Sequence, residues 1–375
     1  MTLVLNEEQQ ILKAAAHDFL QSKAPVSHLR ELRDGGADAG YSPQLWKEIA
    51  EMGWAAILVP EEYGGLGYGY MGLGIVLEQC GRTLTPSPLL ASALTGVTAL
   101  LRAGSKEQCA SILPAVATGD HLFALAVDDT AYHRPQKCLT TVRKTDDGFV
   151  LSGTKTAVID GSSADTLIVS ARTADSGDIS LFLVAGNAPG VDVHGVKALD
   201  THRMATVRFD DVALDQDALL GEFGAGLSPL DAILDAARIG QSAELLGIAQ
   251  EAFERTMEYL KQRKQFGVPI GSFQGLQHRA AIMFGEIEMC KSAVLHALKA
   301  LDDEQENIAE IASLTKAKLC ETTHTVTTEG IQMHGGIGMT DEYEIGFFLK
   351  RCKILETLYG DRYFHLDRFA TLRAY

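Results

Sequence analysis

Two segments in the C-terminal half of the chain carry residue types that hold phosphate-bearing ligands. The first reads Arg-Lys-Gln-Phe-Gly-Val-Pro-Ile-Gly-Ser-Phe-Gln from Arg263 to Gln274. We expect Arg263 at the end of a helix and Phe266 just beyond it, where a forked guanidinium can grip phosphate oxygens. An arginine before a glycine is more often a solvated helix end, so the first segment needs support from elsewhere.

The second segment, residues 332–338, supplies that support. It closes an expected helix and then places Gly335-Gly336 at the helix end. Glycine lets the backbone approach a ligand closely, although the same pair also suits an ordinary helix C-terminus. Both roles can hold together, so the two segments jointly indicate a site for a phosphate-bearing ligand, which we call the clamp.

Three types of pattern along the chain predict the elements that position this clamp. Apolar residues recur at helical spacing in 7–20, 43–52 and 71–81, and a glycine-rich loop is expected at 60–67. Short β-rich runs separated by turn residues follow, and they predict antiparallel strands at 122–127, 148–152, 166–171, 179–184 and 204–209. Long helices are expected at 228–262, 273–303 and 308–334, with a last one after Asp361.

The predicted fold class is therefore α+β, with three consecutive domains. Residues 1–120 form an N-terminal helical domain, 121–222 a middle antiparallel β domain, and 223–375 a C-terminal four-helix bundle. The long C-terminal segments have apolar stripes and charged opposite faces, which is typical of helices that pack in a bundle.

Composition excludes several classes of protein. The net charge of −16 disfavours binding to a nucleic acid backbone. The six cysteines are scattered without a C-x-x-C pair, so we expect reduced thiols and neither a disulfide framework nor a metal site. The opening residues lack a basic and apolar leader, and no window of eighteen apolar residues occurs. We therefore expect a cytoplasmic protein with no membrane association.

The two segments together resemble the paired flavin-binding signatures of the acyl-CoA dehydrogenase family. The loop Pro-Glu-Glu-Tyr-Gly-Gly-Leu-Gly at 60–67 is similar to that family's P-E-x-Y-G-G-x-G loop, and the resemblance extends from the helix at Glu7 to Arg368. It implies the domain order predicted above, FAD as cofactor, and assembly into dimers or tetramers through the bundle. The resemblance further implies that the clamp binds the ADP half of an FAD held by the neighbouring subunit. The residues that it implies for this role are Arg263, Phe266, Gln274, Gln332, Met333, His334, Gly335 and Gly336.

The resemblance also implies an oxidoreductase that removes α and β hydrogens from an acyl-CoA, as in fatty acid or steroid catabolism. A glutamate normally takes the α proton in that family, but Tyr359-Gly360 stands where the Glu-Gly pair is expected. Tyrosine is a poor base at neutral pH because its pKa is about 10. The family's second position for the base falls on Ala237, beside Arg238, which is the candidate substrate contact.

Two carboxylates remain as candidates for the base. Asp361 lies two residues beyond the usual glutamate position, and Asp235 lies two residues before Ala237, on a different face of the expected helix. Each of them is more readily explained as a surface or capping carboxylate.

The middle domain departs from the family pattern as well. Residues 127–135, Val-Asp-Asp-Thr-Ala-Tyr-His-Arg-Pro, replace the T-E-P-x-x-G-S-D loop that binds the flavin. Residues 157–161, Ala-Val-Ile-Asp-Gly, replace W-I-T-N-G, so the aromatic and the threonine that meet the flavin ring are absent. Backbone amides can still serve a flavin, because they do not depend on the side chain.

These departures from the family pattern affect one group of residues. Residues that act on a subunit's own flavin ring and substrate are replaced, whereas residues that reach a neighbour's flavin are kept. We therefore favour a partner subunit of a heteromeric acyl-CoA dehydrogenase, lacking the catalytic base. The alternatives are a homomeric acyl-CoA dehydrogenase with a relocated base, a flavin monooxygenase or oxidase on the same fold, and a flavin-free scaffold subunit.

Overall fold

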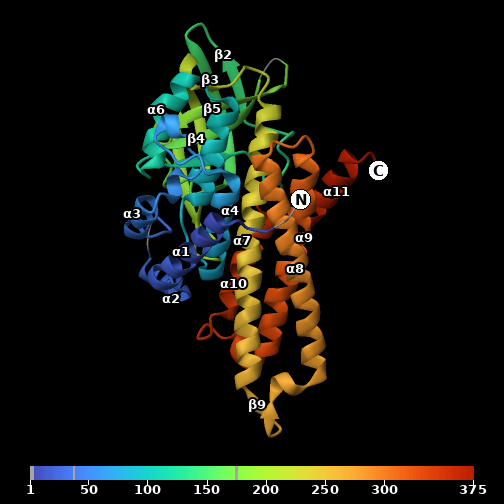
Figure 1. Cartoon of the computed structure of the whole chain (residues 1–375). Coiled ribbons are helices and arrows are strands. Elements are labelled where there is room, and N and C mark those ends of the chain that lie inside the picture. Colours follow the sequence, from blue (N-terminus) through green and yellow to red (C-terminus); the bar gives the residue numbers. More distant parts are fainter. Residues whose placement is uncertain (1–3, 37–38, 174–175) are drawn as a thin grey trace. The chain divides into compact units, whose positions relative to one another are not determined.

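A computed structural model describes residues 4–36, 39–173 and 176–375 (Figure 1). The chain divides into two compact units. We call the first the helical unit, made of Met1–Glu31, Tyr70–Thr85 and Arg238–Tyr375, and the second the sheet unit, made of Leu32–Gly69 and Pro86–Ala237. The predicted boundaries at 120/121 and 222/223 stay predictions. None of the helices in the described residues is long and apolar enough to cross a bilayer.

Besides α2 (Val26–Gly35), which is divided between the two units, seven of the described helices have most or all of their residues in the helical unit. They are α1 (Glu7–Lys23), α4 (Gly69–Thr83), α7 (Leu227–Gln262), α8 (Gln274–Asp302), α9 (Ile308–His334), α10 (Ile345–Thr357) and α11 (Arg362–Leu372). The predicted helices at 7–20, 71–81, 228–262, 273–303 and 308–334 are confirmed. No sequence pattern predicted a helix at residues 345–357, so the bundle region has α10 in addition to the four predicted helices.

Close backbone contact joins α4 to α7 inside the helical unit. A Cβ added to Gly81 would lie 2.1 Å from the carbonyl oxygen of Glu244, and one added to Gly247 would lie 1.8 Å from that of Glu78. Both distances are far below van der Waals contact, so the two helices can approach this closely because both positions are glycine.

The sheet unit combines short helices with one mixed sheet. Its helices are α3 (Pro43–Glu51), a π-helix (Leu89–Gly96), α5 (Val97–Ala103) and α6 (Lys106–Ala117), and α2 (Val26–Gly35) enters it from the helical unit. The strands are β1 (Phe123–Ala126), β2 (Thr141–Lys144), β3 (Gly148–Ile159), β4 (Thr166–Thr173), β5 (Ile179–Ala185), β6 (Val191–Lys197), β7 (Arg203–Asp215) and β8 (Leu219–Leu220). The sheet order is β6-β7-β3-β2-β4-β5-β8, and β1 also pairs with β4.

The prediction of a wholly antiparallel middle domain is wrong for two strand pairs. β1 pairs with β4 in parallel, from Phe123 opposite Thr166, and β2 pairs with β4 in parallel as well. Parallel partners need a long connection, and here β2 and β3 lie between β1 and β4 along the chain. Turn residues indicate where strands end, but they do not say which distant strands pair. The remaining pairs of this sheet are antiparallel, as predicted.

Candidate cofactor clamp and the residue 359 segment

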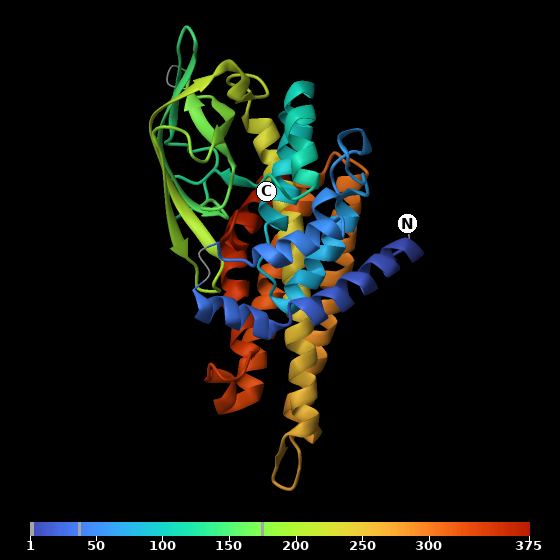
Figure 2. The same cartoon turned by 90° about the vertical axis from the view of Figure 1, so that its left-hand side faces the viewer.

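A β-hairpin carries the first half of the predicted clamp. α7 ends at Gln262, and β9 (Lys264–Gln265) then pairs antiparallel with β10 (Val268–Pro269). Phe266 and Gly267 form the two-residue turn, with φ angles of 54° and 82°. Positive φ at both central residues defines the turn type that matches the twist of a hairpin. Figure 1 and Figure 2 show this hairpin at the far tip of the α7 and α8 pair.

The hairpin holds an aromatic side chain away from its own unit. Phe266 is 92% exposed, and its ring lies edge to face with that of Phe273 at 6.2 Å between centroids. A non-glycine residue with positive φ is uncommon, and a bulky one is strained. Arg263 and Gln274, at the two ends of the hairpin segment, are also exposed. These side chains are available to a molecule outside the helical unit.

The second half of the clamp lies at the end of α9, near the base of the hairpin. Tyr259, one turn before the hairpin, donates a hydrogen bond from its hydroxyl to the carbonyl oxygen of His334 at 3.2 Å. Gly335 has a φ of 65°, and a Cβ added there or at Gly336 would meet no heavy atom within 4 Å. The structure therefore brings the two sequence segments to the same end of the helical unit, with the glycine backbone facing open space.

Two predicted clamp side chains face inward instead. Met333 is 5% exposed and His334 is 3% exposed, whereas Gln332 is exposed. The His334 ring lies between Tyr259 and Tyr343, at centroid distances of 4.3 Å and 4.8 Å. Burial lowers the pKa of His334 below its usual range, while its hydrogen bond to Gly330 opposes that change. The cofactor roles of Met333 and His334 remain predictions, and in this conformation their backbone is the part open to a ligand.

Buried cations fix the segment that carries Tyr359. Arg238 has no exposed surface, and its Nε donates a hydrogen bond to the carbonyl oxygen of Tyr359 at 3.0 Å. Lys316 of α9 donates from Nζ to the carbonyl oxygens of Leu355 and of Leu358, the latter at 3.3 Å. Both cations therefore satisfy carbonyl groups at and just beyond the C-terminus of α10, where positive charge is favourable.

The side chain of Tyr359 is itself 6% exposed, and its backbone φ is 55°. The next residue must be glycine for space as well as for its φ of 108°, because an added Cβ would lie 2.3 Å from Cδ1 of Phe364. The segment therefore has a fixed backbone around a residue with no carboxylate. Arg238 serves this backbone, and its role toward a substrate stays a prediction.

The two candidate bases lie in different surroundings. Asp361 is exposed and caps α11, accepting a hydrogen bond from the backbone N–H of Phe364 at 2.8 Å. It also lines a cavity of about 430 Å³ together with Glu356 and His324. Asp235 is 3% exposed within α7, so the expectation of a surface or capping carboxylate is wrong for this residue. The capping role considered for Asp361 is confirmed, and the role of either residue as a base remains a prediction.

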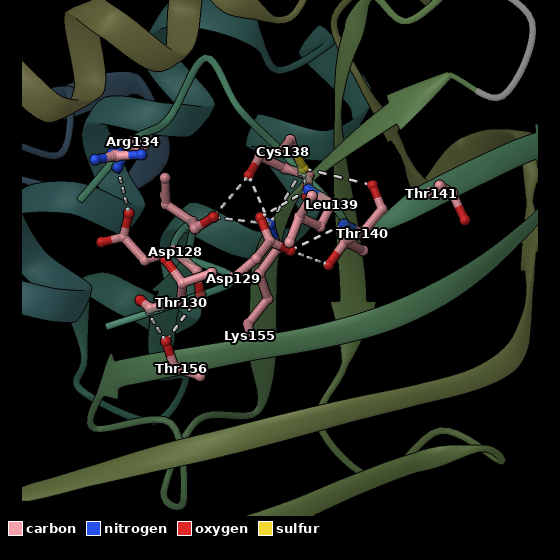
Figure 3. Close-up of polar contacts among 12 residues, drawn as sticks. Asp128, Asp129, Thr130, Arg134, Cys138, Leu139, Thr140, Thr141, Lys155 and Thr156 are labelled. Carbon is pink, nitrogen blue, oxygen red and sulfur yellow. Dashed lines mark hydrogen bonds and ion pairs between the residues drawn. The ribbon is translucent and has the colours of Figure 1, made fainter. Parts of the chain in front are cut away.

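A buried lysine organises residues 127–135, where the resemblance places a flavin-binding loop (Figure 3). Lys155 has no exposed surface, and its Nζ donates to the carbonyl oxygen of Val127 at 2.7 Å and to Oδ2 of Asp129 at 3.1 Å. Asp129 also accepts hydrogen bonds from the backbone N–H of Thr140 at 2.9 Å and of Leu139 at 3.1 Å. Both carboxylate oxygens of Asp129 therefore accept hydrogen bonds from within the sheet unit.

The carboxylate of the neighbouring residue, Asp128, also has a polar partner within the sheet unit. Asp128 lies 2.9 Å from Nδ1 of His133, and Thr156 donates from its hydroxyl to the carbonyl oxygen of Thr130 at 2.9 Å. Directly after Thr156, β3 is bulged against β7, and the exposed Ala157 has a φ of 52°. Where the resemblance expects a flavin-facing aromatic, the sheet unit therefore presents a methyl group on a strained bulge.

Three side chains that organise these regions were missed by the sequence analysis. Lys155 and Lys316 are buried lysines whose partners lie far away along the chain, and Tyr259 connects the two clamp segments. A lysine within an apolar stretch is the available signal for a buried cation, but it does not reveal the partner. In the part of the chain that the structure describes, no group of three His, Cys, Asp or Glu side chains is placed to hold a metal ion.

Comparisons with known proteins give one family for the whole chain. Family models match as "Acyl-CoA dehydrogenase, N-terminal domain" at residues 6–120, as the middle domain at 128–212, and as the C-terminal domain at 224–371. A relative from Bacillus subtilis (strain 168), named "Acyl-CoA dehydrogenase", is 30% identical over 367 residues, which cover 95% of either chain.

Solved structures of two-chain assemblies are also similar to this chain. A variant of the steroid ACAD Tcur3481-Tcur3483 has a TM-score of 0.90 and 30% identity, over 100% of this chain and 99% of that one. The ChsE4-ChsE5 complex from Mycobacterium tuberculosis has a TM-score of 0.91 and 25% identity, with the same coverage.

Proposed function

Because the chain belongs to the acyl-CoA dehydrogenase family, we propose that it serves the α,β-dehydrogenation of an acyl-CoA as the subunit without a catalytic base. In this proposal the chain lends its clamp to an FAD held by a partner chain of the same family. The partner supplies the glutamate that takes the α proton. The residues of this chain bind and orient, and they move no proton.

The outward position of Phe266 is the observation that carries this proposal. Its ring is 92% exposed at the hairpin tip and touches the ring of Phe273 edge to face, so most of its surface is open to a ligand. A base such as adenine can stack on it, and Arg263 at the start of the hairpin segment offers donors to a diphosphate. The backbone at Gly335 and Gly336 fits the same ligand, because a Cβ at either position would meet no heavy atom within 4 Å.

FAD, when bound, accepts the hydride from the β carbon while a base takes the α proton. Arg263, Phe266, Gln274 and Gln332 would hold its ADP half by their exposed side chains, and Gly335 and Gly336 by their backbone. The residues of the sheet unit that would face the flavin ring are less suited to binding FAD than the clamp residues are. Asp128 and Asp129 are engaged inside the loop, and the bulge at Ala157 carries no aromatic ring.

An exposed apolar face on α8 supports assembly with a second chain. Ile282 and Met289, seven residues apart and therefore on one side of the helix, are 65% and 53% exposed. Large apolar side chains grouped along one helix are typical of an interaction surface. The two-chain assemblies among the similar structures support a partner that differs from this chain.

The proposal is tested by a complementation assay with straight-chain and steroid acyl-CoA thioesters. The partner is an acyl-CoA dehydrogenase-like chain that carries the Glu-Gly pair, produced with and without this chain. We expect turnover with both chains together, none with this chain alone, and none when the partner's glutamate is changed to glutamine. Turnover by this chain alone at an ordinary enzymatic rate contradicts the proposal.

The second candidate is a homomeric acyl-CoA dehydrogenase with a relocated base. The observation that favours it is the cavity of about 430 Å³ beside the residue 359 segment, which Asp361 and Glu356 both line. The substitution Asp361→Asn separates the two candidates, because it abolishes turnover by the chain alone if Asp361 is the base.

A further inference from the structure

His334 occupies a place between the two clamp segments that a ligand-contact role does not explain. Its ring is buried between Tyr259 of α7 and Tyr343 of the segment before α10, stacked on the first at an interplanar angle of 29° and tilted 46° to the second. The next two residues are Gly335 and Gly336. The orientation of this ring therefore fixes the point at which the open glycine backbone leaves α9.

The hydrogen bonds of His334 define its protonation state. Nδ1 lies 2.6 Å from the carbonyl oxygen of Gly330, so Nδ1 must carry a proton and donate it. Nε2 is buried and has no hydrogen-bond partner among the described residues. A neutral ring with its lone pair on Nε2 suits this site. Protonation of Nε2 would add both a charge and an N–H group without an acceptor.

Among the described residues, the charged groups named below lie near the ring and already have partners. The Tyr259 hydroxyl already donates to the carbonyl oxygen of His334. Arg255 of α7 pairs with Glu344, beside Tyr343, and with Glu251 at 2.9 Å. Glu329 of α9 pairs with Arg279 of α8. The residues of the 3-10 turn Gly335–Met339 are not titratable.

We propose that His334 is a positioning residue whose neutral ring holds the Gly335-Gly336 backbone in the shape that the cofactor needs, and whose protonation releases it. This inference rests on the proposed function for the identity of the ligand, FAD, but the response of the backbone to acid does not depend on it. The burial that opposes a charged ring places the transition below the ordinary histidine range. Weakly acidic solution would therefore weaken FAD binding through this segment.

The size of the effect follows from the population of the neutral ring. One pH unit below the pKa of the ring, about one tenth of the molecules keep it neutral, so the apparent affinity for FAD falls about tenfold. The substitution His334→Phe keeps an aromatic ring between the two tyrosines but cannot titrate. It should remove this loss of affinity.

Hydrogen–deuterium exchange of the full-length chain between pH 7.5 and 5.0, corrected for the intrinsic exchange rate, tests the inference without a partner. We expect faster exchange at residues 334–340 of the wild type as the pH falls, with a midpoint below about 6.5, and no such change in His334→Phe. The matched control His296→Gln, at an exposed position on α8, should behave as the wild type. A flat wild-type profile, or an unchanged acid response in His334→Phe, overturns the inference.

A second readout separates this inference from the proposed function. FAD binding by the two-chain complex is titrated over the same pH range for the wild type and for His334→Phe. Absence of FAD from the complex at every pH contradicts the proposed function and leaves the exchange result standing. Tight binding with the same acid loss in both proteins contradicts the positioning role alone. If His334→Phe does not fold, His334→Gln replaces it in both measurements.

Discussion

The Nε of Arg238 donates a hydrogen bond to the carbonyl oxygen of Tyr359 across 3.0 Å in a site with no solvent exposure at Arg238. This contact holds the backbone at the position that the resemblance assigns to a catalytic glutamate. Because the bond reaches the backbone, it does not depend on the side chain at 359. The chain therefore keeps the supporting structure of that position without its proton acceptor.

Removing this support should destabilise the protein. We expect Arg238→Met to lower the free energy of unfolding by about 1–3 kcal/mol, the usual cost of leaving a buried acceptor unpaired. Urea denaturation measures the change, and Lys264→Met at an exposed position of the helical unit is the control. Unchanged stability together with weakened acyl-CoA binding would instead assign Arg238 to the substrate.

Phe266 should matter for the cofactor and not for the fold. Because its ring is 92% exposed, Phe266→Ala should change the free energy of unfolding by less than about 0.5 kcal/mol. Loss of one stacked base costs about 1–3 kcal/mol, so the FAD affinity of the two-chain complex should fall at least about fivefold. Tyr375→Ala, which removes a ring that is 95% exposed, serves as the control for FAD titration. Equal affinities in both variants would remove Phe266 from the clamp.

Arg263 should act through the shape of its guanidinium. Arg263→Lys keeps the charge but loses the forked donor pair, so we expect FAD to dissociate more readily from the complex. The rate of FAD release after dilution measures this effect. The adjacent exposed residue gives the matched variant Lys264→Ala, for which the rate should not change. A similar rate of FAD release from the wild type and from Arg263→Lys would indicate that Arg263 acts through its charge and not through its forked donor pair.

Acid stability of the sheet unit should depend on Asp129. Burial alone would raise the pKa of Asp129, but the charge of Lys155 and hydrogen bonds from Thr140 and Leu139 outweigh it and hold that pKa below its usual value. The pKa of Asp129 is lower in the folded protein than in the unfolded chain, where it is about 3.9. Its ionised carboxylate therefore stabilises the fold fully above the unfolded-chain pKa. This stabilisation is lost as the pH falls through the lower pKa of the folded protein.

The substitution Asp129→Asn should therefore lower stability at pH 7 by about 3–5 kcal/mol, because it leaves Lys155 buried without its carboxylate. It should also flatten the dependence of stability on pH below about 4. Thermal unfolding between pH 7 and pH 2.5 measures both changes. Asp146→Asn, in an exposed turn, is the control. If Asp129→Asn and Asp146→Asn both keep the wild-type dependence of stability on pH, Asp129 does not determine that dependence.

The exposed face of α8 should mediate assembly. Ile282→Lys places a charge among apolar side chains and should shift the two-chain complex toward separate chains, because burying an unpaired charge is costly. Light scattering after size-exclusion chromatography measures the mass. Lys291→Ala, on the same helix but half buried with a surface ion pair, is the comparison. A complex that survives Ile282→Lys places the interface elsewhere.

Sequence patterns predicted the helices and strands of this fold better than the contacts between segments that lie far apart in the chain. Helical spacing identified the long helices, and the clamp motifs identified residues that the structure gathers at one end of the helical unit. The hairpin at Lys264–Pro269 was not predicted, because its turn begins with Phe266 and lacks the Asn-Gly or Asp-Gly pair that usually indicates such a turn. The inward position of His334 was also invisible, since it depends on Tyr259 and Tyr343 from other segments.

The same limit applies to the buried lysines. Lys155 is 26 residues away from Asp129, and the carbonyl oxygen that Lys316 reaches at Leu355 is 39 residues away. Spacing of this kind has no period, so no local pattern indicates it. Tertiary contact alone turns these lysines from apparent surface residues into the centres of buried polar groups.

The visible absorption spectrum of the purified chain, recorded alone and after co-purification with a glutamate-bearing partner, tests the central claim most directly. The account predicts a colourless protein alone and a yellow complex whose absorption bleaches when an acyl-CoA is added. A chain that is yellow by itself and bleaches with an acyl-CoA would contradict it, because both the flavin pocket and the base would then be self-contained.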